Sequence, residues 1–399
     1  VYSREVFDYK EQEIKMEKEY LIREKPLKAL LFFAFPMIIG NLFQQFYTMV
    51  DSVVVGRFVG ENALAAVGAS YSLTNVFISI AIGGGMGASV LTSRYFGGRN
   101  YKRMKTSVST ALLSFLAVSI VLGGAGLLLG KEIMELLNTP ENIMEDATEY
   151  LNIYFIGLPF LFMYNVLASM FNALGKSRIP LYLLIFSSVF NVVLDVIMVY
   201  SFHMGVAGVA WATLIAQGIS AVMAFLIFAG EMKSYEGGEQ SQWFDKRELG
   251  EMCRIALPSI LQQSTVSIGM MLVQSVVNSF GAQMLAGYSA GMRIESICIV
   301  PMAAMGNVMS SYTAQNLGAG KQERAVKGYH TAYGIVFGFG ILLCVILELF
   351  YRPLIAMFLG EEGTVLAMNT GMSYMRLIGF FFRFIGLKMI TDGLLRGAG

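Results

Sequence analysis

The chain has 399 residues, of which 55% are hydrophobic and only 14% are charged, and its formal net charge is +1. Soluble domains carry about 25% charged residues, so this composition, with a mean hydropathy of +0.60, excludes an ordinary soluble protein and gives no sign of a nucleic-acid partner. The three cysteines show no metal-ligand spacing and the two histidines are isolated, so we expect neither an enzyme nor a bound cofactor.

Ten apolar stretches are each long enough to cross about 30 Å of hydrocarbon. Because lipid offers no water to the backbone, each stretch should be a helix. In chain order the stretches are 29–55, 63–93, 106–130, 146–174, 179–202, 205–230, 251–279, 284–314, 328–351 and 366–395. The glycine-rich run at 83–87 suits close helix packing. The sequence therefore predicts an all-α, polytopic protein of the lipid bilayer.

Lysine and arginine are distributed unevenly between the two sets of loops. Of the 29 cations, 22 precede the first stretch, follow the tenth, or lie in the loops that face the same side as these ends. The opposite loops hold only Arg57, Lys131 and Arg352. Cytoplasmic loops carry the excess of cations in membrane proteins. We therefore expect the N-terminal segment 1–28 to be cytoplasmic and the acidic loop around Glu141 to face outside.

The second half of the chain repeats the first about 222 residues later. The recurring residues include Ala34, Pro36, Ile38, Val54, Gly60, Gly97, Arg103 and Thr110, which return as Ala256, Pro258, Ile260, Val276, Gly281, Gly318, Arg324 and Thr331. The start of the second copy lies six stretches after the start of the first. An even number of crossings returns the chain to the same side of the membrane, so the copies should be parallel, as in many secondary transporters. The predicted organisation is a first lobe at 29–230, a cytoplasmic inter-lobe loop at 231–250, and a second lobe at 251–399.

The repeat also predicts more chain than is present. The final residues 396–399 align with 172–175, after which two further stretches follow in the first copy. We expect roughly 55 additional residues and two more spans beyond Gly399, which would complete a bundle of two six-helix lobes. The chain opens at Val1, and Met16, ahead of a basic segment, is a plausible start.

Ionisable side chains inside apolar stretches are costly and mark candidate functional sites. Asp51 lies in the first stretch, and Asn191 and Asp195 are four apart on one face of the fifth. Thr213 lies in the sixth, and the predicted orientation puts all four side chains within one or two helical turns of the same depth. Two carboxyl groups, an amide and a hydroxyl at one level can bind a proton or a hard cation. Asp51 taken alone is also explained as an acid at the membrane surface.

Several segments together resemble the multidrug and toxic compound extrusion (MATE) family, most closely its DinF-like bacterial branch. They are 36–60 with the run Asp51-Ser52-Val53-Val54-Val55-Gly56-Arg57, 95–100 (YFGGRN), 173–180 (ALGKSRIP) and 394–399 (LLRGAG). The resemblance runs from about residue 28 to the end. It implies twelve helices in two lobes that alternate access and exchange an organic cation or drug for H⁺ or Na⁺, in a monomer of the bacterial cytoplasmic membrane. It also implies cation binding by Asp51, Asn191, Asp195 and Thr213.

The second lobe departs from the Na⁺-coupled NorM-like branch, because its first stretch has no carboxylate where Asp51 stands in the first lobe. The acids of this lobe that we consider as candidate site residues are Glu295 and Asp392. Glu295 is interpreted either as a polar site or as the partner of a cation such as Arg293, although residues two apart on a helix face different directions. Asp392 is interpreted either as a second site residue or as a solvated helix end.

Two other functions are compatible with a duplicated membrane bundle. A flippase for lipid-linked oligosaccharides would need clustered cations to hold pyrophosphate, and the stretches offer only Arg293, Arg376, Arg383 and Lys388. A channel or sensor belongs to a different class and would need neither the duplication nor the buried acids. Uphill, concentrative transport would distinguish an antiporter from a channel.

The predicted orientation can be tested by labelling. In the variants Gly237→Cys and Glu141→Cys, a membrane-impermeant thiol reagent should reach the two positions from opposite sides, with position 141 exposed outside. The unmodified protein, which retains Cys253, Cys298 and Cys344, gives the background. Labelling of both positions from one side would overturn the topology.

Overall fold

The computed structural model describes residues 19–136, 139–235, 242–359 and 364–399, and these residues are almost entirely helical. After the short helix α2 (Tyr20–Arg23), ten long helices follow one another along the chain. They are α3 (Pro26–Val54), α4 (Glu61–Gly97), α5 (Tyr101–Leu136), α6 (Glu141–Ala173), α7 (Arg178–Val196), α8 (Gly205–Lys233), α9 (Lys246–Ser279), α10 (Ala282–Gly318), α11 (Gln322–Leu359) and α12 (Val365–Ala398). Two five-residue π-helical turns, η1 (Val55–Val59) and η2 (Ile197–Ser201), extend α3 and α7.

Each of the ten predicted stretches forms a helix, which confirms the all-α fold. Within the described residues, nine helical segments are long and apolar enough to cross a membrane. The tenth stretch forms α12, but its hydropathy is lowered by five charged residues: Arg376, Arg383, Lys388, Asp392 and Arg396. Its counterpart α6 in the first repeat qualifies as a span by the same measure. Composition alone therefore does not mark α12 as a span.

The internal repeat appears in the helices themselves. The second helices of the two copies, α4 and α10, each have 37 residues, and the fourth, α6 and α12, have 33 and 34. Gly60 precedes α4 with φ +119° and Gly281 precedes α10 with φ +93°. Only glycine adopts this backbone region readily, so the two copies share the turn as well as the helices that it joins.

The helices pack into two units whose boundaries cut through two helices. Unit 1 comprises Val1–Leu42, insofar as it is described, with Gln262–Gly399, and unit 2 comprises Phe43–Leu261. Helix α3 therefore begins in unit 1 and ends in unit 2, and α9 does the reverse. The lobes predicted from the sequence, 29–230 and 251–399, differ from these units because they divide neither α3 nor α9 between the two lobes. The division into these two lobes stays a prediction. Met16 and Gly237 lie outside the described residues.

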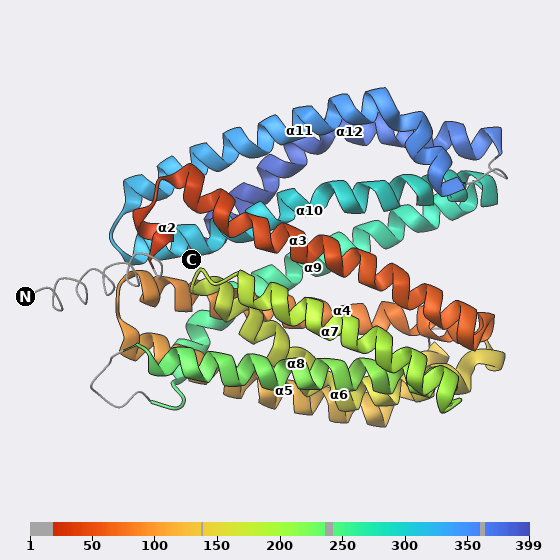
Figure 1. The fold of residues 1–399 in the computed structure, drawn as a ribbon, viewed down its shortest axis with the longest axis horizontal. Coiled ribbons are helices and arrows are strands. Elements are labelled where there is room, and N and C mark those ends of the chain that lie inside the picture. The colour runs from red at the N-terminus through yellow and green to blue at the C-terminus, as the bar shows by residue number, and fades with distance from the viewer. Residues whose placement is uncertain (1–18, 137–138, 236–241, 360–363) are drawn as a thin grey trace, which may run out of the picture. The chain divides into compact units, whose positions relative to one another are not determined.

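Unit 2 is arranged around α6, which packs against α4, α5 and α8, while α7 packs on α8 (Figure 1). The first half of α9 lies close to the glycine-rich part of α4. A Cβ atom on Gly83 would come within 2.7 Å of Ile260 Cγ1, and one on Gly87 would meet the backbone of Met252. The small residues that the sequence places in this run therefore let α4 and α9 approach closely.

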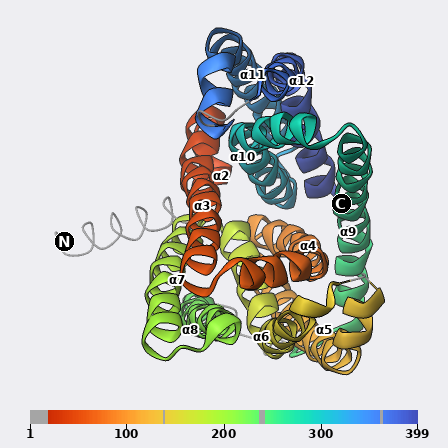
Figure 2. The ribbon, with the colours of Figure 1, turned by 90° about the vertical axis from the view of Figure 1, so that its right-hand side faces the viewer.

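Unit 1 is built from α10, α11 and α12, which pack against one another (Figures 1 and 2). Its core includes the fully buried side chains of Tyr312 and Phe382 together with Leu30 and Phe33 from the first half of α3. Glycines on α12 make its contact with α10 close, and a Cβ atom on Gly393 would overlap the carbonyl oxygen of Gly306.

The contact between α10 and α12 predicts opposite effects for two glycine substitutions. Gly393→Ala should lower the free energy of unfolding by about 1–3 kcal/mol, because the added methyl group forces the helices apart. Gly338→Ala is the matched control, since a Cβ atom there meets nothing within 4 Å, and alanine favours the helix by about 1 kcal/mol. Thermal unfolding of the purified variants in detergent measures both. Equal melting temperatures for the two variants would contradict the packing.

Candidate functional site

The four residues predicted at one depth of the first lobe lie together in unit 2. Asp51 is on α3, Asn191 and Asp195 are on α7, and Thr213 is on α8. Asn191 is 2% exposed and Asp195 is fully buried. The part of α3 that carries Asp51 belongs to the same unit as α7 and α8. The structure therefore assembles these residues into one cluster within unit 2.

The carboxyl groups of Asp51 and Asp195 lie close enough to interact directly with each other. Two ionised carboxylates repel each other and neither can donate a hydrogen bond, so a shared proton or a bound cation would stabilise this arrangement. In addition, Oδ1 of each aspartate is buried and has no hydrogen-bond partner in the described part of the chain. Buried, unsatisfied oxygens of this kind are suitable ligands for a hard cation.

The Asn191 amide links the acid pair to Thr213. In one orientation Oδ1 accepts from the Tyr47 hydroxyl and Nδ2 donates to Thr213 Oγ1 at 3.4 Å. In the reversed orientation Nδ2 donates to Asp195 Oδ2 at 3.2 Å, and Oδ1 accepts from the Thr213 backbone N–H at 3.1 Å. The reversed amide satisfies more groups. In both orientations Asn191 holds α7 and α8 in register at the level of the acids.

Two tyrosines complete the cluster, and neither is among the site residues predicted from sequence. Tyr47 contacts Asn191, and Tyr150 on α6 interacts electrostatically with both aspartates. Tyr47 precedes Asp51 by four residues, a spacing that puts both side chains on one helix face, so the sequence did contain a signal for it. Tyr150 gave no such signal, because its helix reaches the cluster only through tertiary packing.

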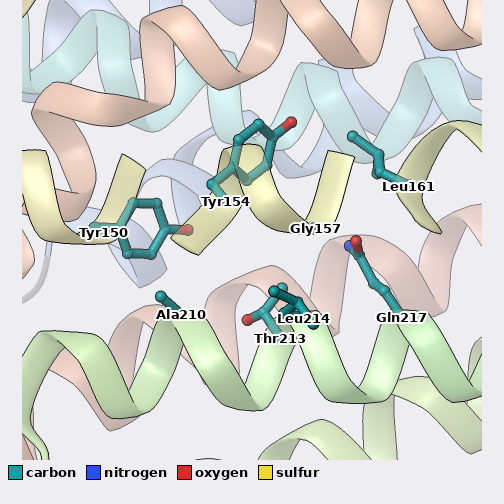
Figure 3. Close-up of a pocket in the computed structure, with 8 residues that line it drawn as sticks. All are labelled: Tyr150, Tyr154, Gly157, Leu161, Ala210, Thr213, Leu214 and Gln217. Carbon is teal, nitrogen blue, oxygen red and sulfur yellow. The ribbon is translucent and has the colours of Figure 1, made fainter. Parts of the chain in front are cut away.

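A small cavity lies between α6 and α8 beside the cluster, with room for about one water molecule. Figure 3 shows Tyr150 and Tyr154 from α6 above Thr213 and Gln217 from α8. The polar groups that line the cavity are two tyrosine rings, a hydroxyl and an amide. A water molecule here would have the polar partners that it needs and would meet the cluster at Thr213.

Beyond the acids, the π-helical turns close one end of the cluster with apolar side chains. η1 and η2 follow Asp51 and Asp195 along their helices and contact each other. A buried group formed by Val55, Ala63, Val199, Val206 and Val209 packs there against Tyr150. π-helical turns are rare and often accompany functional sites. The segments that follow the two acids along their helices are therefore apolar, whereas Asn191, Thr213 and Tyr47 of the cluster are polar.

The acids of unit 1 are placed differently. Glu295 on α10 accepts a hydrogen bond from the Tyr374 hydroxyl of α12, whose ring lies edge-on to Tyr288 at 5.2 Å. Its partner is therefore a tyrosine of another helix rather than Arg293. Asp392 accepts from Gln262 Nε2 and from Lys388 Nζ, both at 2.7 Å. Asp392 is thus a paired group within unit 1 and not a solvated helix end.

A duplicated bundle of long apolar helices with acids buried inside is an architecture of secondary transporters. The family model described as MatE matches residues 36–197 and 258–399. The chain therefore belongs to the MatE family, whose members are transporters and not enzymes.

Comparisons with individual proteins support the assignment to this family. The chain is 31% identical to the Bacillus subtilis "Probable multidrug resistance protein YpnP" over 94% of its own length and 83% of that protein. It is 27% identical to "Probable multidrug resistance protein YoeA" of the same organism, over 87% and 78%. An outward-facing structure of a multidrug resistance MATE family transporter matches with a TM-score of 0.85 at 24% identity, over 95% of this chain and 84% of that one. This likeness shows the fold; the assignment to the DinF-like branch stays a prediction.

The contact between Tyr47 and Asn191 predicts that the Tyr47 hydroxyl orients the amide. Tyr47→Phe removes one hydrogen bond to a buried polar group, so binding of a cation at the cluster should weaken by about three- to tenfold, as expected for a loss near 1 kcal/mol. Titration of purified protein with H⁺ or Na⁺, followed by intrinsic fluorescence, measures the affinity. Tyr182→Phe is the control, because this tyrosine of α7 is 64% exposed. An unchanged affinity in Tyr47→Phe would exclude this role.

Proposed function

We propose that the chain is a secondary active antiporter that exports organic cations or drugs in exchange for H⁺ or Na⁺ by alternating access. The observation that carries the proposal is the contact between Asp51 and Asp195, two carboxyl groups of one buried cluster. The proposal places the protein, as a monomer, in the bacterial cytoplasmic membrane with its N-terminal segment in the cytoplasm. The names of the similar multidrug resistance proteins support this substrate class.

The coupling follows from the charge of the acid pair. With a proton or Na⁺ between them, the two carboxyl groups carry one negative charge at most and can stay in contact. When the cation leaves, two like charges repel each other in a site shielded from water, and the contact is lost. Asp51 is on α3 and Asp195 on α7, so occupancy of the site controls whether these helices stay together. An organic cation that neutralises the same carboxylates competes with the coupling ion.

The residues of the cluster fit either coupling ion. Na⁺ prefers oxygen ligands, and the cluster offers the carboxylates of Asp51 and Asp195, the amide oxygen of Asn191 and the hydroxyl of Thr213. A proton needs only the two carboxyl groups. Glu295 forms a second polar site in unit 1, where it accepts a hydrogen bond from Tyr374. Asp392 is a weaker candidate, since Lys388 already neutralises it.

The pairing of cations with acids argues against the alternative function, a flippase for lipid-linked oligosaccharides. Of the four cations within the predicted spans, Arg376 pairs with Glu348 at 2.7 Å and Lys388 pairs with Asp392. Arg383 lies over the Phe380 ring at 4.0 Å. Two of the four charges are thus neutralised within unit 1, which leaves too few to hold a pyrophosphate group.

Substitution of either aspartate should abolish coupling. In proteoliposomes with separately imposed H⁺ and Na⁺ gradients, Asp51→Asn and Asp195→Asn should each reduce gradient-driven efflux of ethidium by at least about 100-fold, because one carboxyl group alone cannot form the shared site. Insertion into the membrane should be unchanged.

The matched control for this pair is Glu149→Gln, an exposed acid next to Tyr150, which should leave efflux unchanged. Normal efflux by either aspartate variant would refute the assignment. Downhill flux alone, with no response to either gradient, would favour the channel.

A further inference from the structure

The short helix α2, which precedes α3, is held in unit 1 by three side chains from α10, from the turn that follows it and from the start of α11. The last carbonyl groups of a helix have no donors within that helix. Here Asn316 Nδ2 donates to Leu21 O at 3.2 Å and Lys321 Nζ donates to Ile22 O at 3.2 Å. The Arg324 guanidinium donates to Leu21 O at 3.3 Å and also to Glu24 O. Cations at the C-terminal end of a helix also interact favourably with its dipole.

The side chains that receive α2 are themselves fixed by buried contacts. The Arg324 guanidinium lies over the Tyr312 ring at 5.8 Å, and the Tyr312 hydroxyl donates to the Arg324 carbonyl at 3.2 Å. Tyr312 and Asn316 are fully buried, and Leu21 is 1% exposed. This arrangement differs from a surface ion pair. A surface ion pair contributes little to stability, because ordering its two exposed side chains costs conformational entropy.

The first copy of the repeat has a corresponding arrangement. Arg103, the counterpart of Arg324, lies over the Tyr95 ring at 6.0 Å. The Tyr95 hydroxyl donates to Glu248 Oε1 at 2.9 Å, and Glu248, in the first turn of α9, is only 4% exposed. The backbone N–H of Asp245, just before α9, donates to Thr110 Oγ1 at 3.0 Å. In unit 2 the start of α9 is thus held by the segment equivalent to the one that holds α2.

Both helices held in this way are the ones that pass from one unit to the other. α3 begins in unit 1 and carries Asp51 in unit 2, while α9 begins in unit 2 and ends in unit 1. We propose that the contacts of Arg324 with α2 anchor the start of α3 in unit 1, so that α3 transmits the loss or gain of a cation at Asp51 to that unit. Arg324 is then a positioning residue for transport. The inference rests on the proposed antiport.

The physical basis is that a helix transmits displacement along its axis only if its far end is fixed. When the acid pair separates, the end of α3 shifts with Asp51. If the start of α3 is bound through α2, unit 1 must respond. If that anchor is lost, the start of α3 is held in unit 1 only by its apolar side chains, such as Leu30 and Phe33, and the exchange of cations drives unit 1 less effectively. The anchor should therefore affect the rate of the conformational change and leave the affinity of the acid site as it is.

The test compares three variants of the purified full chain in proteoliposomes. In Arg324→Ala the maximal rate of gradient-driven ethidium efflux should fall about three- to tenfold, the size expected when one element of a coupled network is removed. The equilibrium Kd for ethidium should not change. Arg324→Lys keeps one charged donor and should recover part of the rate. Lys327→Ala removes an exposed cation of the same helix and should behave as the unmodified protein does.

An unchanged maximal rate in Arg324→Ala would overturn the inference, and so would an equal loss of ethidium affinity, which would indicate general damage. If Arg324→Ala does not fold, Lys321→Ala tests the inference instead, because it removes one donor to α2 from an exposed side chain. The maximal rate of ethidium efflux by this variant should fall about twofold, with an unchanged Kd for ethidium. Absence of gradient-driven efflux in the unmodified protein would overturn the proposed function itself and the inference with it.

Discussion

The contact between the carboxyl groups of Asp51 and Asp195 is the constraint on which the rest of unit 2 depends. Two acids buried side by side are stable only with a positive charge between them, and the neighbouring groups are arranged to keep that charge exchangeable. Asn191 and Thr213 supply oxygens without adding charge. An apolar group that includes valines of η1, η2 and α8 packs against Tyr150, which also lines a water-sized cavity beside Thr213. A site built in this way can bind a small cation and release it again.

The internal repeat gives both units the same helices but not the same chemistry. If the ends of α6 and α12 are aligned at Gly175 and Gly399, Tyr374 stands where Tyr150 stands in the first copy. Tyr150 lies near the aspartate pair, and Tyr374 donates a hydrogen bond to the single Glu295. One copy has therefore kept two carboxyl groups in contact while the other has one acid satisfied by a hydroxyl. This asymmetry is what assigns coupling to unit 2 in the proposed mechanism.

Much of the fold could be predicted from the sequence, because the bilayer imposes simple rules on it. An apolar stretch long enough to cross the bilayer must form a helix. The depth of Asp51, Asn191, Asp195 and Thr213 in the membrane then follows from counting residues along those helices. Tyr47 was within reach of the same argument through its spacing from Asp51. Tyr150 was not, since a tyrosine near the end of a span is ordinary in membrane proteins.

The partners of the helices could not be predicted. Hydropathy says that the first halves of α3 and α9 are apolar, but not that each packs in the unit formed mainly by the other copy. The same holds for Glu295, whose nearest candidate in the sequence was Arg293 and whose observed partner, Tyr374, is 79 residues away. Contacts of this length are decided by tertiary packing.

The most direct test of the account is to count the ions released when an organic cation binds. Purified protein in a weakly buffered detergent solution would be saturated with ethidium while a pH-sensitive dye and a Na⁺-selective electrode record release. Because linked ligands change each other's affinity reciprocally, competition at the acid pair predicts release of about one H⁺ or Na⁺ per ethidium bound, and none from Asp195→Asn. Binding of ethidium without release of either ion, or the same release from Asp195→Asn, would contradict the account.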